Sequence, residues 1–184
     1  PVGYPKLFRL PVFPEKSTSV KQRELSNMQL HKSMGGGRFT PALLGDMPRE
    51  LAFSVAEYRE RVSSVKRGMG ESGIDILLVT YPPNVLYLSG FQTFSNYGGE
   101  CVILPLEGEP TLVVHPPELG GALLHSWIED HACYPPESSR GSYLATILHE
   151  RKLSDARIGV EKKTQGVPAQ YWDHLRTELP KARD

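Results

Sequence analysis

From residue 54 onward, segments with helical spacing alternate with short runs of apolar residues. The first helical segment begins at Ser54, because Glu57 stands three residues later and the two have the spacing of a capping box. Its apolar residues recur at steps of three and four: Val55, Tyr58, Val62, Val65 and Met69. The run 74–79 is almost entirely apolar and predicts a strand buried on both faces. A helix and a strand of this kind bury their apolar sides against each other, which indicates an α/β fold.

The later part of the chain continues this alternation. Gly68, Gly70 and Gly73 are expected to end the first helix. Strands at 101–106 and 111–115 are joined by a connection short enough for an antiparallel hairpin. The other predicted elements are a turn over 81–84, a short helix at 85–88, helices after Pro116, near 143–152 and from Pro168, and strands at 131–134 and 157–161. Helices that alternate with strands around one hairpin predict a three-layer α/β domain with a mixed sheet.

The chain has the length of one domain, with 184 residues of which 39% are hydrophobic. Residues 1–49 lack sustained periodicity and are rich in proline and glycine, so we assign them to an N-terminal arm that is partly disordered or docked. Residues 50–184 form the predicted domain. The arm holds 8 Lys and Arg against 3 Asp and Glu, and the body 13 against 18. The basic residues of the arm stand singly, which argues against nucleic-acid binding. They favour contact of the arm with the acidic body or with a neighbouring subunit.

The sequence predicts a cytoplasmic location and no membrane partner. No segment approaches the ~20 apolar residues that span a bilayer, and residues 1–20 lack the apolar core of a signal peptide. Cys101 and Cys133 are the only cysteines, and neither has the spacing of a metal ligand. We expect both thiols to be reduced and buried.

Two short motifs match known signatures only in part. Gly68-x-Gly70-x-x-Gly73 has the letters of a dinucleotide-binding fingerprint, but it closes a helix where the fingerprint must open one. His149-Glu150 lacks the second histidine of a zinc-protease motif, because Leu153 occupies that position. Neither motif therefore predicts a cofactor.

Three histidines offer a candidate metal cluster: His115, His125 and His131. Carboxylates lie near them in the sequence, but the spacings fit no ligand pattern. Each histidine also suits an ordinary place at a strand end, on a helix surface or in a turn. We therefore expect no metal, no cofactor and no catalytic residue in this chain.

Residues 91–99 place three aromatic side chains and two glycines between a helix and a strand. Loops of this composition often form the wall of a ligand site or an interface. We select Phe94, Asn96 and Tyr97 as candidate substrate-site or interface residues, because their small and polar neighbours suit an exposed tip. Phe91 directly follows the helix end and is assigned to the core. The alternative is that all the aromatic residues of this loop cap the core.

Two stretches resemble a known family. One is Asn84-x-x-Tyr87-Leu88-Ser89-Gly90-Phe91, followed by a strand and then Gly-Glu-Pro-Thr-Leu-Val-Val. The other is Ile158-Gly159-Val160-Glu161, followed by a helix containing Tyr171. Their order and spacing over about residues 54–180 resemble the N-terminal domain of creatinases, prolidases, Xaa-Pro aminopeptidases and ectoine hydrolases. The arm 1–49 departs from that pattern.

The resemblance implies a ribonuclease-H-like sheet in this domain and a separate C-terminal "pita-bread" domain that carries the catalytic groups. It implies a parent hydrolase that acts on Xaa-Pro peptides, creatine-like guanidino acids or ectoine-like ring amides, in that order of expectation, with a divalent metal such as Mn, Co or Zn in some branches. The implied partners are that catalytic domain and a second subunit, whose substrate site this domain covers in a homodimer.

The sequence stops where the linker to the catalytic domain is expected, so we expect this chain to be inactive by itself. The alternative is a stand-alone binding or chaperone-like module of the same fold.

Overall fold

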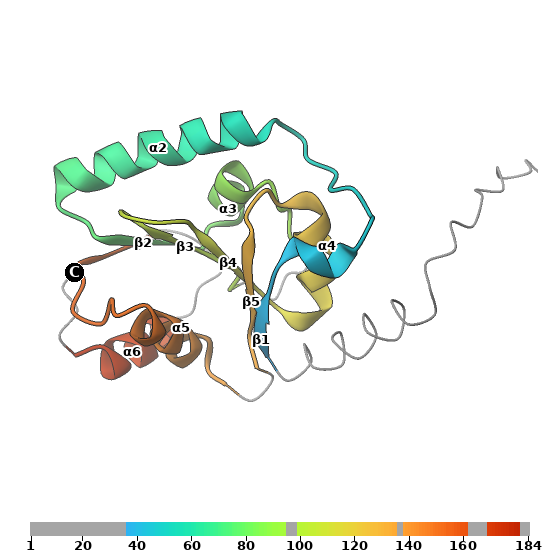
Figure 1. Cartoon of the computed structure of the whole chain (residues 1–184). Helices are drawn as coiled ribbons and strands as arrows, with labels where there is room; N and C mark the ends of the chain where they lie inside the picture. The colour runs from blue at the N-terminus through green and yellow to red at the C-terminus, as the bar shows by residue number, and fades with distance from the viewer. Residues whose placement is uncertain (1–35, 95–98, 136–137, 162–168, 181–184) are drawn as a thin grey trace, which may run out of the picture.

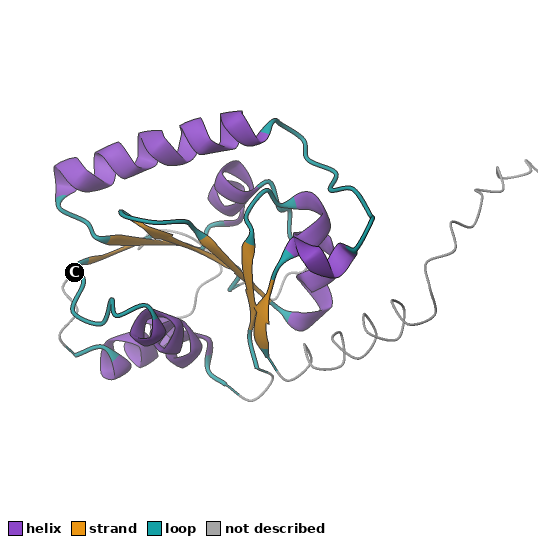
Figure 2. Ribbon diagram, in the orientation of Figure 1, coloured by secondary structure: helices purple, strands orange, loops and turns teal. Residues whose placement is uncertain are grey.

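A mixed β-sheet lies between two layers of helices (Figures 1 and 2). The structure is a computed structural model, and it describes residues 36–94, 99–135, 138–161 and 169–180. Helices α2, α3 and α4 cover one face of the sheet, and α5 and α6 cover the other (Figure 1). The predicted three-layer α/β architecture is therefore confirmed.

The sheet has six strands in the order β1-β5-β4-β3-β2-β6. Their bounds are β1 Gly37–Phe39, β2 Ile76–Val79, β3 Cys101–Pro105, β4 Thr111–Val114, β5 Asp130–Cys133 and β6 Ile158–Val160. The predicted hairpin of β3 and β4 is antiparallel, as expected. Strand β3 also pairs antiparallel with β2, and β1 pairs antiparallel with β5. The β4–β5 and β2–β6 pairs are parallel, which makes the sheet mixed.

The helices follow the apolar spacing of the sequence. Their bounds are α2 Val55–Ser72, α3 Pro82–Ser89, α4 Leu119–His125, α5 Arg140–Glu150 and α6 Ala169–Glu178, with short 3-10 turns η1 Pro41–Leu44 and η2 Pro116–Glu118. The Ser54 hydroxyl accepts a hydrogen bond from the Glu57 N–H, so the predicted cap of α2 is confirmed. Tyr58, Val62 and Met69 are buried, whereas Val65 is only half-buried.

Two boundary predictions were wrong. Helix α2 continues through Gly68 and Gly70, and only Gly73, with φ of 66°, ends it. The buried side chains of α2 offset the cost of glycine inside a helix, which is about 1 kcal/mol per residue. The predicted turn at 81–84 is the start of α3. Pro82 and Pro83 occupy the first helical positions, where the backbone N–H that proline lacks would have no partner within the helix.

Strand β1 lies within the segment assigned to the arm, where no strand was predicted. It adds to the edge of the sheet beside β5. Arg38 of β1 forms an ion pair with Asp130 of β5, and Phe39 and Leu43 pack partly buried against the core. Three residues are too few to show the period-two alternation that identifies a strand. Pairing with β5 therefore determines that residues 37–39 form a strand.

Candidate functional site

Three buried polar side chains lie at one edge of the sheet: Thr80, Glu100 and Glu118. Strands β2, β4, β5 and β6 end at this edge, and the antiparallel β3 begins there, as the pairs Val79 with Val102 and Cys101 with Val113 show. Val114 also pairs with Cys133 in the parallel pair of β4 and β5. The carboxyl ends of strands are where α/β sheets bind ligands. We therefore call this the carboxyl edge and treat it as the candidate site.

The residues that follow α3 reach the carboxyl edge, where the Thr93 side chain contacts Glu118. Phe91 is buried in the core cluster beneath α3, which confirms its assignment. Phe94 is 75% exposed and so does not cap the core. Asn96 and Tyr97, the other two candidates, lie outside the described residues. Of the three candidates, the structure therefore places Phe94 alone.

A pair of buried carboxyl groups lies behind this loop. Glu100 precedes β3 and is 2% exposed, and Glu118 ends η2 and is 1% exposed. Burial, together with a hydrogen bond to Glu118, raises the pKa of Glu100 to about 7. The Thr93 hydroxyl donates a hydrogen bond to Glu118 Oε1. The loop is thus attached to the carboxyl pair through Thr93.

Three further side chains surround the pair. His115, directly after β4, places Nε2 3.9 Å from Glu100 Oε1. The Tyr134 hydroxyl, directly after β5, donates to the Gly99 carbonyl over 2.5 Å. Arg140, the first residue of α5, packs so closely under Gly99 that an added Cβ would lie 2.6 Å from its Cδ. His115, Tyr134 and Arg140 also line a hollow of about 390 Å³.

The two sequence blocks that carry the family resemblance meet at the same edge. Glu161 follows β6, and its carboxylate accepts hydrogen bonds from the N–H groups of Thr80 and Tyr81, both over 2.7 Å. It also accepts one from Asn84 Nδ2 over 2.6 Å. An anionic carboxylate at the start of α3 also suits the helix dipole. Asn84 and Glu161 therefore fix α3, whose C-terminal end leads into the loop.

The candidate histidines do not come together. His115 lies at the carboxyl edge, whereas His125 approaches the Glu50 carbonyl at the end of α4. His131 is fully buried in β5, and neither ring nitrogen has a hydrogen-bond partner among the residues that the structure describes. No group of three or more potential ligands able to hold a metal ion occurs within the described part of the chain.

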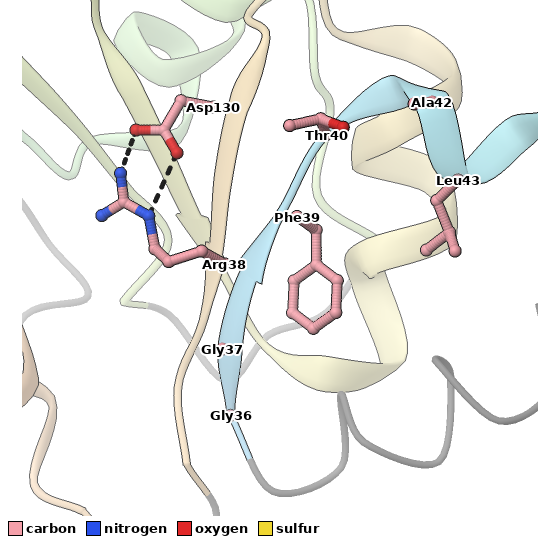
Figure 3. A pocket seen from close by; sticks show the side chains of 8 residues that line it. All are labelled: Gly36, Gly37, Arg38, Phe39, Thr40, Ala42, Leu43 and Asp130. Atoms are coloured by element: carbon pink, nitrogen blue, oxygen red, sulfur yellow. Dashed lines mark hydrogen bonds and ion pairs between the residues drawn. The ribbon is translucent and has the colours of Figure 1, made fainter.

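A second hollow, of about 550 Å³, lies along β1 (Figure 3). Phe39, Thr40 and Leu43 form much of its lining, and Arg38 is joined to Asp130 at one side. The Asp130 carboxylate also accepts hydrogen bonds from Arg151 and, over 2.7 Å, from the Thr111 hydroxyl. Through these contacts, Asp130 links β1, β4 and β5. Its carboxylate oxygens are already bonded to these neighbours, so they are poorly placed to bind a ligand.

Residues 61–184 match the creatinase/prolidase N-terminal domain family. The chain belongs to this family. It is 34% identical over 142 residues to an ectoine hydrolase from Halomonas elongata, a match that covers 72% of this chain and 36% of that protein. It is 26% identical over 141 residues to an uncharacterized hydrolase/peptidase from Sinorhizobium fredii, with the same coverage.

Solved structures of the family share the fold. An Xaa-Pro aminopeptidase from Streptococcus pyogenes superimposes with a TM-score of 0.57 at 19% identity, covering 71% of this chain and 91% of that one. The dipeptidase PepE from Mycobacterium ulcerans gives a TM-score of 0.56 at 20% identity, covering 71% of this chain and 34% of that one. The chain spans about a third of the length of the curated relatives that it matches.

The sequence analysis did not find the Glu100–Glu118 pair. The two residues stand on separate elements, and no spacing rule links them. One signal in the sequence could have indicated the pair, because Glu100 directly precedes a strand that is entirely apolar.

In the described part of the chain, no helix has the length and apolar character needed to cross a bilayer.

Proposed function

We propose that this creatinase/prolidase N-terminal domain supports dimerisation of a parent hydrolase and covers the substrate site of the partner subunit with its carboxyl edge. The observation that carries this proposal is the exposure of Phe94. A large aromatic side chain left in solvent costs free energy unless another surface covers it. Phe94 directly follows Thr93, whose hydroxyl donates to Glu118 at the carboxyl edge, and α/β folds place their ligands at such an edge.

The rest of the edge supports the same role. Glu161 and Asn84 fix α3, and the buried Glu118 holds Thr93, so the residues before Phe94 have a defined position. Preorganised groups lose less entropy when they meet a substrate or a partner. A rigid base under an exposed aromatic residue suits a surface that closes over a site.

For the parent hydrolase, we propose ectoine or a similar small ring amide as the substrate. The 34% identity to an ectoine hydrolase supports this choice over Xaa-Pro peptides, which the sequence analysis placed first. Peptides and creatine-like compounds are the competing classes. The test is to assay the full-length parent with ectoine, Xaa-Pro dipeptides and creatine, with and without added Mn²⁺, Co²⁺ or Zn²⁺.

The role of Phe94 is tested in the same full-length protein. Phe94→Ala should lower kcat/KM by roughly tenfold, or about 1.4 kcal/mol of transition-state stabilisation, at an unchanged melting temperature. Phe91→Ala is the matched control, because Phe91 is buried and its loss should lower the melting temperature. A Phe94→Ala variant with unaltered kinetics would refute the covering role.

The isolated 184-residue chain separates this proposal from a stand-alone binding module. We expect it to turn over none of these substrates. If it also suppresses the aggregation of unfolded client proteins, and the loss of Phe94 does not affect the parent's kinetics, the chaperone-like alternative is favoured.

A further inference from the structure

The two buried carboxyl groups at the carboxyl edge call for a chemical explanation. Glu100 and Glu118 are both almost completely removed from water. Two carboxylates that share a buried site cannot both ionise without strong repulsion. One of them therefore keeps its proton at pH values where an exposed glutamate has lost it.

The groups around the pair favour one arrangement of this proton. Thr93 donates to Glu118, which suits a Glu118 that is ionised and accepts hydrogen bonds. Glu100 then carries the proton and shares it with Glu118. Burial raises the pKa of Glu100, in agreement with this arrangement, and the positive charge of Arg140 opposes the shift only in part.

We propose that Glu100 and Glu118 form a proton-sharing pair that positions Thr93, and through it Phe94, so that the exposed end of the loop responds to pH. When Glu100 loses its proton, two carboxylates face each other. Glu100 borders β3, a central strand whose pairing on both sides holds it in place. Thr93 is half-buried and lies outside any helix or strand, so Thr93 is the side of this contact that can shift.

Other titratable groups face the pair, and the experiment has to distinguish their effect on the loop from that of the pair. His115 places Nε2 3.9 Å from Glu100 Oε1, and histidine as a residue type is the side chain whose charge most often switches near physiological pH. The positive charge of Arg140 lowers the pKa of Glu100 and so acts against its protonation. Tyr134 and Cys101 also sense the charge of Glu100, but burial raises the pKa of both well above neutrality. His115 is therefore the competitor that a test has to exclude.

The sign of the effect follows from the raised pKa. The folded state holds the Glu100 proton more tightly than the unfolded state, whose glutamate has a pKa of 4.5. The favourable arrangement is therefore complete below about pH 4.5 and is lost as the pH rises through about 7. The loop should be most firmly held on the acidic side of neutrality.

The experiment places a 4-fluorophenylalanine at position 94 of the 184-residue chain and follows its ¹⁹F signal from pH 5 to pH 9. We expect one transition near pH 7 that disappears in Glu100→Gln and in Glu118→Gln. It should persist in His115→Gln. A flat signal in the unsubstituted chain, or a transition lost only in His115→Gln, overturns the proposal.

A measurement without substitution covers the case in which a variant does not fold. In the chain labelled with ¹³C at the glutamate carboxyl carbon, one resonance should titrate near pH 7. If every glutamate resonance titrates below pH 5.5, the proton-sharing pair does not exist.

The consequence for catalysis rests on the proposed function. In the full-length parent, the pH profile of kcat/KM should have a limb near pH 7 that Glu100→Gln removes. If the fluorine signal titrates but the profile is the same in both proteins, the covering role fails and the proton-sharing pair stands. If neither titrates, the pair itself is wrong.

Discussion

At the scale of single residues, His131 is the polar side chain whose burial is hardest to offset. It is fully buried in β5, and within the described part of the chain neither ring nitrogen has a hydrogen-bond partner. Loss of solvation lowers the pKa of His131 from 6.5 to about 4. The folded protein therefore holds a neutral imidazole where the unfolded chain gains a proton.

This burial makes stability depend on pH. The unfolded state binds more protons between pH 6.5 and pH 4, so the free energy of unfolding should fall by about 3 kcal/mol across that range. His131→Leu should remove most of this slope and leave stability at pH 7 equal or higher, because the two unpaired ring nitrogens are then no longer buried. Urea denaturation at several pH values measures both effects.

The control is His149→Gln, at an exposed position, which should keep the slope. A His131→Leu protein with the same slope as the unsubstituted chain would assign the acid sensitivity to other groups.

At the scale of elements, α2 shows that glycines with the same sequence signal have different roles. Gly68 lies inside the helix, and a Cβ there would meet nothing within 4 Å. Gly73 ends the helix in the left-handed conformation, and a Cβ there would collide with the Arg157 guanidinium. Its N–H bonds the Gly70 carbonyl, and the Ile74 N–H bonds the Met69 carbonyl, which closes the end of the helix.

The two glycines should therefore respond in opposite directions to the same substitution. Gly68→Ala should raise the free energy of unfolding by about 0.5–1 kcal/mol, because alanine loses less backbone entropy in a helix. Gly73→Ala should lower it by at least about 1 kcal/mol, because alanine is strained at positive φ. Thermal denaturation of the pair checks the prediction, and effects of equal sign would show that the end of α2 has been misplaced.

At the scale of the whole molecule, the N-terminal segment completes the sheet. Phe39, Leu43 and Leu44 of this segment pack against the main core. Arg49 bonds the Trp127 carbonyl over 3.1 Å and the Glu129 carboxylate over 2.7 Å. The segment therefore covers one edge of the sheet and part of the core beside it.

A chain that begins at Glu50 should be less stable by about 3 kcal/mol or more, since it loses these partly buried side chains. It should also associate, because β5 becomes an uncovered edge strand. Urea denaturation and size-exclusion chromatography measure the two effects. A chain that begins at Gly36 keeps all these contacts and is the matched control. If the two chains have the same free energy of unfolding and the same oligomeric state, β1 contributes nothing to the sheet.

Some features of this protein follow from neighbours in the sequence. The cap at Ser54, the apolar run of β2 and the short connection between β3 and β4 each depend on residues a few positions apart, so the three-layer α/β class could be predicted. The burial of Phe91 at the end of α3 was predictable for the same reason.

Other features depend on residues that are distant in the chain. Strand β1 exists because β5 offers it an edge, and the Glu100–Glu118 pair exists because the end of η2 comes to lie beside the start of β3. Neither residue type nor spacing encodes such a meeting. A carboxyl group acquires its unusual proton affinity only when folding removes water and brings the second carboxyl beside it. The local sequence therefore determined most of the elements, and the tertiary structure decided strand β1 and the chemistry of the carboxyl edge.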